Sequence, residues 1–371
     1  MTETTRCDVL IIGGGPAGAS CARALKQAGL DVRVLDKSSF PRDKVCAGWV
    51  TPQVLAALDI DTADYARGRV LQPISGFRTG LIGNRAMDTD YDRTISYGIR
   101  RCEFDHYLLQ HAGVPLLLGE PVRSLQRSDH GWRVNDHIET RLLIGAGGHF
   151  CPVAQHLGAR TGRDERAVFA QETEFAMSPG QRSACRAQGE RPELYFCNDL
   201  KGYGWVFRKD DYLNIGLGRE DREQLSSHVD SFIDWLRVEG RIPPDIPGRL
   251  KGHAYLLYRH GQRKRVGNRV LLIGDAAGLA YTQSGEGIRP AIESGLIAAR
   301  LVAEVAGDYS GERLADFSDR LVQRFGEIRP DNSLLPAGLR NSIGRWLLGG
   351  RCFTRHIVLG DWFLHRRQTA V

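Results

Sequence analysis

Hydrophobic and polar positions near the N-terminus change from a strand pattern to a helix pattern and back. The apolar, β-branched run Cys7–Ile12 predicts a buried strand. Apolar residues at helical spacing then predict a helix over Ala19–Ala28, which ends at Gly29. A further run, Asp31–Leu35, predicts a second strand, which stops at Asp36. The pattern therefore predicts a complete β–α–β unit.

The middle of the chain instead has a period of two and many aromatic residues. Alternation of this kind is found in Ala167–Met177, Glu193–Asn198, Tyr203–Lys209 and Tyr212–Gly218. Asp210-Asp211 lies between the last two runs and has the length and composition of a hairpin turn. This region is therefore predicted to be an antiparallel sheet, separate from the N-terminal unit.

The helical period returns later in the chain. Helices are predicted over Phe104–Ala112, Ser226–Glu239, Ile288–Ala306 and Glu312–Ile328, and a buried strand over Arg269–Ile273. Strands and helices thus alternate discontinuously, with the antiparallel region in between.

A glycine-rich turn, Gly13-Gly14-Gly15-Pro16-Ala17-Gly18, joins the first strand to the first helix and fits G-x-G-x-x-G. Gly13 would make the tight turn, Gly15 would let the backbone approach a pyrophosphate, and Gly18 would let the helix pack on the strand. Asp36 follows 18 residues after Gly18 and can accept hydrogen bonds from ribose hydroxyls. Its carboxylate disfavours a 2′-phosphate, so we expect NAD or FAD rather than NADP.

A second glycine-rich segment follows the strand Arg269–Ile273. It contains Gly274-Asp275 and then Ser284-Gly285-Glu286-Gly287-Ile288. A strand that runs into Gly-Asp can aim a carboxylate at a sugar-alcohol chain, and backbone N–H groups can stabilise negative charge near a flat ring. Nicotinamide has no ribityl chain, so two such segments favour FAD over NAD.

Composition excludes several other classes. The chain has 371 residues, 42% of them hydrophobic and 25% charged, with a net charge of +6 that is mostly spread out. No motif for nucleic-acid binding accompanies this charge. None of the eight cysteines forms a C-x-x-C pair or a zinc spacing, so we expect no metal site and reduced thiols in the cytoplasm. No signal peptide or membrane span is expected.

Further motifs carry a resemblance to a known family. Arg101 with Phe104-Asp105 (R-x-x-F-D), together with the glycine turn and GDAAG…GEGI, resembles the FAD-dependent group of p-hydroxybenzoate hydroxylase, flavin-dependent halogenases and geranylgeranyl reductases. Two segments are similar to the geranylgeranyl reductase branch. They are Phe40–Gly48 (FPRDKVCAG), similar to P-R-x-K-x-C-G-G, and Gly202–Phe207 (GYGWVF), similar to G-Y-G-W-x-F-P-K.

The resemblance implies an α/β fold: a discontinuous Rossmann-like FAD-binding domain, an inserted antiparallel-sheet substrate domain and a helical C-terminus. The expected FAD-binding domain comprises residues 1–68, 97–165 and 252–330. The substrate domain comprises 69–96 and 166–251, and residues 331–371 form the C-terminal helical segment. The tail Trp346–Arg367 is expected to be a helix that packs on the FAD-binding domain. The alternative is peripheral contact with a membrane surface, through which a lipid substrate would enter.

The resemblance also assigns site residues. The cofactor-binding set is Gly13, Gly15, Pro16, Ala17, Gly18, Asp36, Lys37, Arg42, Arg101, Gly147, Gly274, Asp275, Gly285, Gly287 and Ile288. The set at the flavin and substrate cavity is Cys46, Gly48, Tyr203 and Trp205. Cys46 is equally compatible with a role as a buried core residue, and a strand tryptophan such as Trp205 is more often part of the core. None of the 11 histidines lies in a recognisable catalytic arrangement.

Three departures from the branch qualify the assignment. Ala47 replaces a glycine, Arg208 replaces a proline, and Gly147-Gly148 stands where many relatives carry Asp-Gly. The missing aspartate is associated with FAD and NAD(P)H handling, and no second G-x-G-x-x-G is present. The reductant is therefore left open between NAD(P)H bound transiently and an electron-donor protein.

The predicted function is an FAD-dependent oxidoreductase that acts on a hydrophobic small molecule or lipid. The first hypothesis is C=C reduction of an isoprenoid-like chain. One alternative is an FAD-dependent monooxygenase of a hydrophobic or aromatic substrate. Another is a flavin electron carrier to a quinone or partner protein. A halogenase is disfavoured because W-x-W-x-I-P is missing.

Overall fold

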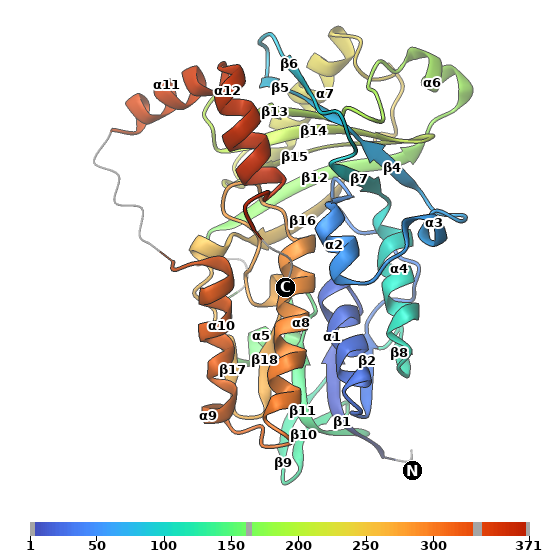
Figure 1. Ribbon diagram of the computed structural model, residues 1–371, viewed down its shortest axis with the longest axis vertical. Helices are drawn as coiled ribbons and strands as arrows, with labels where there is room; N and C mark the ends of the chain where they lie inside the picture. The colour runs from blue at the N-terminus through green and yellow to red at the C-terminus, as the bar shows by residue number, and fades with distance from the viewer. Residues whose placement is uncertain (1–3, 161–164, 329–335, 369–371) are drawn as a thin grey trace.

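The computed structural model describes residues 4–160, 165–328 and 336–368. Figure 1 shows a lower layer built on a parallel sheet, with α1 (Pro16–Gln27) and α8 (Ile288–Glu304) packed side by side against it. A second sheet lies above this layer, and the C-terminal helices run beside it. The predicted fold class is confirmed: a Rossmann-like layer, a second sheet and a helical C-terminus.

The lower sheet has eight strands in the order β17-β18-β11-β1-β2-β8, with β10 on β11 and β9 on β10. Its members are β1 (Thr5–Ile12), β2 (Val32–Asp36), β8 (Leu116–Leu118), β9 (Leu125–Ser128), β10 (Gly131–Val134), β11 (Ile138–Gly145), β17 (Val266–Gly267) and β18 (Val270–Leu272). The pairs from β18 to β8 are parallel, whereas β17, β9 and β10 pair antiparallel. Most residues of β1 are buried, as a strand covered on both faces requires.

The upper sheet has seven strands in the order β16-β12-β15-β14-β13-β5-β6. Its members are β5 (Gly76–Leu81), β6 (Met87–Asp90), β12 (Ala167–Ala176), β13 (Glu193–Phe196), β14 (Gly202–Lys209), β15 (Tyr212–Arg219) and β16 (Lys251–Leu256). Lys209 pairs with Tyr212, which confirms the two-residue hairpin at Asp210-Asp211. The sheet departs from the predicted antiparallel pattern at one pair, because β13 and β5 are parallel.

A small third sheet joins the two layers. It contains β3 (Trp49–Val50), β7 (Ser96–Ile99) and β4 (Leu71–Ile74), in the order β3-β7-β4. Two of the expected domain boundaries fall inside strands: 96/97 lies in β7, and 251/252 lies in β16, which pairs with β12. These boundaries therefore lie in hydrogen-bonded sheet rather than in linkers.

The remaining helices are mostly short. They are α2 (Pro52–Ala57), α3 (Thr62–Tyr65), α4 (Arg101–Ala112), α5 (Pro152–His156), α6 (Pro179–Ala184), α7 (Leu225–Val238), α9 (Gly311–Leu314), α10 (Asp316–Phe325), α11 (Ala337–Leu348) and α12 (Arg351–Phe353). The prediction of one helix over Glu312–Ile328 is wrong. Two helices meet at Ala315, whose N–H donates to the Glu312 carbonyl oxygen three residues earlier, as in a 3₁₀ turn. Gly326, with a φ of 86°, ends the second helix.

Glycines allow α1 to lie very close to its neighbours. A Cβ on Gly18 would lie 1.9 Å from the carbonyl oxygen of Gly13, so only glycine fits the helix against the turn. Gly295 on α8 has the same role, because its Cβ would lie 2.5 Å from the carbonyl oxygen of Ala17. This close packing fixes the N-terminus of α1 beside the N-terminus of α8, and both helices point at the layer boundary.

The C-terminal segment packs differently from the prediction. After α12 the chain forms a π-helix over Thr354–Phe363. Val358, Leu359 and Phe363 are buried in one cluster with strand residues of the upper sheet, among them Phe77 and Phe207. The tail therefore covers the upper sheet rather than the Rossmann-like layer, although its last described residues contact α8 through Arg289 and Gln368.

Candidate active site

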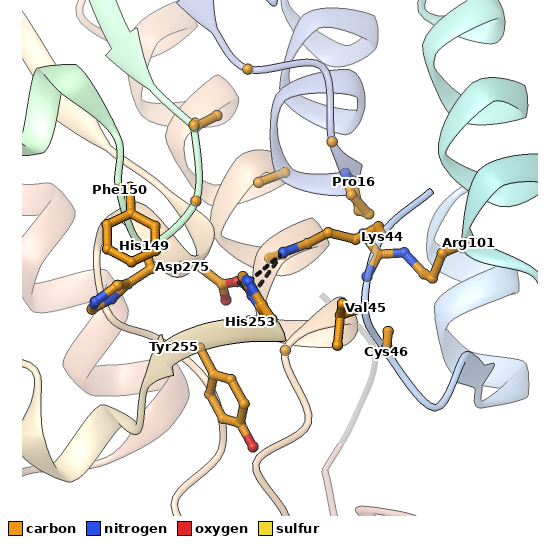
Figure 2. Close-up of a pocket in the computed structure, with 18 of the residues that line it drawn as sticks. Pro16, Lys44, Val45, Cys46, Arg101, His149, Phe150, His253, Tyr255 and Asp275 are labelled. Atoms are coloured by element: carbon orange, nitrogen blue, oxygen red, sulfur yellow. Dashed lines mark hydrogen bonds and ion pairs between the residues drawn. The ribbon is translucent and has the colours of Figure 1, made fainter. Parts of the chain in front are cut away.

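A cavity of about 540 Å³ lies between the two layers. Most of the predicted site residues line it. They are Gly13, Gly15, Pro16, Ala17, Asp36, Lys37, Arg42, Cys46, Arg101, Gly147, Tyr203, Trp205, Asp275, Gly285, Gly287 and Ile288. The first and second glycine-rich segments, more than 250 residues apart in the chain, thus face one space. Figure 2 shows part of this lining, with side chains contributed from both layers.

The N-terminus of α1 forms one end of the cavity. Gly15 is the N-cap residue, Pro16 follows, and among the described residues no side chain caps the helix. The first amide groups of α1 therefore provide positive charge for an anion. A Cβ on Gly15 would meet nothing closer than Arg42 Nη2 at 3.5 Å, so the glycine leaves an open cradle.

Asp36 ties this turn to the end of β2. Its Oδ2 accepts a hydrogen bond from the Gly14 N–H at 2.7 Å, and its Oδ1 accepts one from the Ser38 N–H at 2.8 Å. The carboxylate still lines the cavity. Asp36 therefore orders the turn as well as offering oxygen atoms to a ligand.

Two arginines converge on one buried carboxylate beside the glycine turn. Arg101 makes two hydrogen bonds to Asp105 on α4, at 2.7 and 2.8 Å, and Arg42 Nη2 lies 3.3 Å from Asp105 Oδ2. Within the described part of the chain, Arg42 Nη1 is buried and has no hydrogen-bond partner. A buried donor without a partner is costly, so this atom is available for an acceptor in the cavity.

Lys44, His253 and Asp275 form a charged group that the sequence analysis missed (Figure 2). Lys44 Nζ lies 2.7 Å from His253 Nε2, which lies 3.6 Å from Asp275 Oδ2. Burial lowers the pKa of Lys44 to about 8, although Asp275 opposes the shift. The pKa of Asp275 is lowered despite its burial, because His253 hydrogen-bonds it and Lys44 attracts it. Asp275 is therefore held as a carboxylate in the cavity.

The other end of the cavity is apolar and aromatic. Its lining includes Val45, Ala47, Trp49, Ala170, Tyr255 and the predicted Cys46, Tyr203 and Trp205. The Tyr203 hydroxyl donates to the Ser284 carbonyl oxygen at 2.5 Å and so fixes β14 to the second glycine-rich segment. The Trp205 ring lies over Gly216, whose Cβ would come within 2.3 Å of it. The Trp205 ring thus occupies the space that the missing side chain of Gly216 leaves.

A buried polar group holds the Cys46 loop from behind. Asn214 on β15 donates to the Cys46 carbonyl oxygen at 3.1 Å and to Glu172 Oε2 at 3.2 Å, and it accepts from Trp205 Nε1 at 2.7 Å. Burial raises the pKa of Glu172 to about 7, against the hydrogen bond from the Cys46 backbone and the attraction of Lys209. Nothing in the local sequence of Glu172 or Asn214 marks them, because their partners come from other strands.

Three predicted residues do not line the cavity: Gly18, Gly48 and Gly274. Gly18 packs α1 on its turn, as described above. Gly48 has a φ of 71°, and its Cβ would lie 2.4 Å from the Ile99 carbonyl oxygen. Gly274 has a φ of 60°, and its Cβ would lie 2.9 Å from Ala17 Cβ. These three glycines shape the backbone around the site. Gly48 was expected at the cavity, but it does not line it.

The position of the missing aspartate is sterically restricted. Gly147 lines the cavity, and a Cβ there would lie 3.3 Å from Cys151 Sγ. Next to it, burial and the neighbouring Arg263 lower the pKa of His149 to about 4, so the imidazole is neutral at pH 7. The His149 ring itself is buried against Arg263, and Gly147 presents no carboxylate to this part of the cavity.

Comparison with known proteins agrees with this architecture. Residues 8–101 match the family model described as FAD dependent oxidoreductase. The chain is 29% identical to the geranylgeranyl diphosphate reductase of Oryza sativa over 85% of its length and 70% of the rice protein. It is also 29% identical to the menaquinone reductase of Mycobacterium tuberculosis, over 81% of this chain and 78% of that protein. The chain is an FAD-dependent oxidoreductase.

A solved structure shows the same fold along nearly the whole oxidoreductase. The geranylgeranyl bacteriochlorophyll reductase-like protein of Thermoplasma acidophilum superposes with a TM-score of 0.75 and 21% identity, covering 99% of this chain and 93% of that one. In the described ranges, no group of histidine, cysteine and acidic side chains is arranged to hold a metal ion. Of the helices that the structure describes, none is long and apolar enough to cross a membrane.

Proposed function

We propose that this oxidoreductase reduces C=C bonds in an isoprenoid-like chain. The observation that carries the proposal is the two-part cavity: a charged end with an uncapped helix N-terminus, continuous with an apolar end lined by Trp49, Ala170 and Trp205. The relatives named for geranylgeranyl substrates support the choice of chain. The apolar end has the character expected of a binding site for a hydrocarbon.

The residues at the charged end fit FAD. The amides of α1 and the unpartnered Arg42 Nη1 would bind its pyrophosphate, and Asp36 would bind the adenosine ribose. Asp275 would bind the ribityl hydroxyls and the Gly285–Ile288 backbone would face the ring, since all of them line the cavity. FAD, when bound and reduced, supplies the hydride for the reaction.

The apolar end must also supply a proton to the carbon that does not receive the hydride. Cys46 and Tyr255 both line it and carry ionisable X–H groups. Burial raises the pKa of Tyr255, so its hydroxyl remains protonated at neutral pH. We assign the proton donor to Cys46, which Asn214 holds in place, and a cavity-wall role to Tyr203 and Trp205. For the reductant, we propose an electron-donor protein rather than NAD(P)H, because Gly147 replaces the carboxylate.

Product analysis tests the proposal. Enzyme reconstituted with FAD and reduced by dithionite under nitrogen should convert a geranylgeranyl chain into a product that has gained two hydrogens per reduced bond, as measured by mass spectrometry. Ala170→Phe should abolish turnover while FAD stays bound, because the ring would fill the apolar end. Ala176→Phe, on the exposed end of the same strand, is the matched control.

Other products would contradict the proposal. An oxygenated product in air would identify a monooxygenase. Rapid reduction of a quinone head group, with every isoprenoid double bond intact, would identify an electron carrier.

A further inference from the structure

Helix α11 has two opposite faces. The inner face is formed by Gly344 and Leu348, which lie four residues apart. A Cβ on Gly344 would lie 2.6 Å from Leu200 Cδ1, so this face packs closely on the turn between β13 and β14. Leu348 is buried in the same cluster as Trp205 and Phe363. The helix is therefore fixed to the protein along one side.

The outer face carries an apolar ridge. Leu339, Ile343 and Trp346 follow the helical i, i+4, i+7 spacing, and their exposed fractions are 49%, 40% and 78%. The helical repeat of 100° per residue puts the ridge about 180° from Leu348. A tryptophan this exposed, aligned with two aliphatic side chains, is typical of a contact surface rather than of isolated exposure.

Positive charge surrounds the ridge. At 100° per residue, Arg340 and Arg345 lie on opposite flanks of it. Residues 336–368 contain six arginines and a single acidic residue, Asp361. An apolar ridge between cationic flanks matches the interface of an anionic bilayer, where the hydrocarbon boundary takes the ridge and lipid phosphates take the arginines.

We propose that α11 docks this protein on an anionic lipid surface, with Trp346, Ile343 and Leu339 inserted at the headgroup boundary. The same C-terminal segment reaches the cavity wall: the Phe363 ring lies 5.5 Å from that of Tyr203 and 5.9 Å from that of Trp49. Docking would thus bring a lipid phase next to the segment that backs the apolar end of the cavity. The surface itself is independent of the reaction catalysed.

The charge argues against a second copy of the chain as the occupant. An isologous contact through this ridge would bring two strongly basic C-terminal segments together, because residues 336–368 hold six arginines and one acidic residue. A lipid surface supplies the opposite charge.

Vesicle sedimentation of the FAD-loaded protein tests the proposal. Binding is expected with phosphatidylcholine–phosphatidylglycerol vesicles, with weaker binding to phosphatidylcholine alone and further weakening as salt is added. Trp346→Ser should weaken binding about tenfold or more, because a large side chain no longer enters the interface. Val238→Ser, which changes another side chain that is 85% exposed, should bind like the wild type.

A second pair of variants tests how much the arginine charge contributes to vesicle binding. Arg345→Gln should weaken binding to anionic vesicles only, whereas Arg313→Gln on α9 should have no effect. Quenching of Trp fluorescence by brominated lipids should fall in Trp346→Ser. Equal binding of Trp346→Ser and wild type, or no binding of the wild type to anionic vesicles, would overturn the proposal. So would a concentration-dependent dimer that Trp346→Ser dissociates. These readouts need no turnover, so a failed reductase assay would leave them interpretable.

Discussion

Asn214 on β15 donates a hydrogen bond to the carbonyl oxygen of Cys46, 168 residues earlier in the chain, at 3.1 Å. The same side chain accepts from Trp205 Nε1 at 2.7 Å. Two residues that line the apolar end of the cavity are therefore positioned by one amide that lies behind them. The local sequence predicts neither contact, because each depends on how the strands of the upper sheet are ordered.

Asn214→Ala should loosen both residues at once. It leaves Trp205 Nε1 without a partner and removes the Asn214 hydrogen bond to Glu172, which should destabilise the fold by about 1–3 kcal/mol. Turnover should fall while FAD content stays near that of the wild type, and Cys46 should react faster with an alkylating agent. Asn198→Ala, which removes an exposed hydrogen bond to Ile82, is the control. Unchanged alkylation of Cys46 would show that Asn214 does not position the loop.

Cys46→Ser should lower turnover about 100-fold, as expected when a general acid is replaced by a much weaker one. FAD content should change little, because serine keeps a polar X–H group beside Arg101. Cys352→Ser, at an exposed position that does not line the cavity, serves as the control. Wild-type turnover in Cys46→Ser would return Cys46 to a purely structural role.

Asp275→Asn should reduce FAD affinity about tenfold to a hundredfold, the usual cost of losing a hydrogen bond from a charged group. It also removes the carboxylate that offsets Lys44, so the cation would be left less stable in the cavity. Cofactor retention through a desalting column, followed by thermal unfolding, separates the two effects. Asp59→Asn, at an exposed loop position, should retain FAD like the wild type. Full FAD retention by Asp275→Asn would contradict the assigned role.

Local motifs predicted the charged end of the cavity well, whereas contacts between distant segments escaped them. The glycine turn and Asp275 follow strands that run into glycine, and Asp36 ends the second strand of the β–α–β unit, so their convergence at one sheet edge could be predicted. His253 could not, because it lies on β16 and meets Lys44 across 209 residues. The prediction that the tail packs on the FAD-binding domain was wrong for a related reason. Val358, Leu359 and Phe363 would be equally suited to burial against either layer, and only the assembled sheet determines which one they cover.

Glu172→Gln should change the pH dependence of stability in a defined direction. The folded-state pKa of about 7 is above the usual value, so the folded protein binds more protons than the unfolded chain between about pH 4.5 and 7. Stability contributed by the protonated carboxyl is present below this window and is lost as the pH rises through it. Glu174, Lys209 and Asn214 face the carboxyl.

At pH 8 the glutamine variant should therefore unfold at a higher urea concentration than the wild type. Its free energy of unfolding should be larger by up to about 3 kcal/mol, and the difference should be small near pH 4.5. Glu190→Gln, at an exposed position, should show no pH-dependent difference. A larger gain at low pH than at high pH would contradict the raised pKa of Glu172.

Direct reduction by NADH or NADPH should be slow. In the proposed mode FAD occupies the α1 N-terminus. The sequence has no second G-x-G-x-x-G, and Cys151 restricts any side chain at Gly147, where a carboxylate would stand. Asp105 holds Arg42 and Arg101, and in the proposed mode the remaining Arg42 Nη1 binds the FAD pyrophosphate, so neither arginine is left for a nucleotide phosphate.

Stopped-flow mixing of the oxidised enzyme with each nucleotide measures the bleaching of the flavin. Slow bleaching by both, with fast reduction by dithionite or a ferredoxin-type donor, is the expected result. Fast bleaching by NADPH alone would show that the missing carboxylate does not matter. Bleaching that becomes fast only when a substrate is present would favour the monooxygenase, because substrate commonly gates flavin reduction in the group that the sequence resembles.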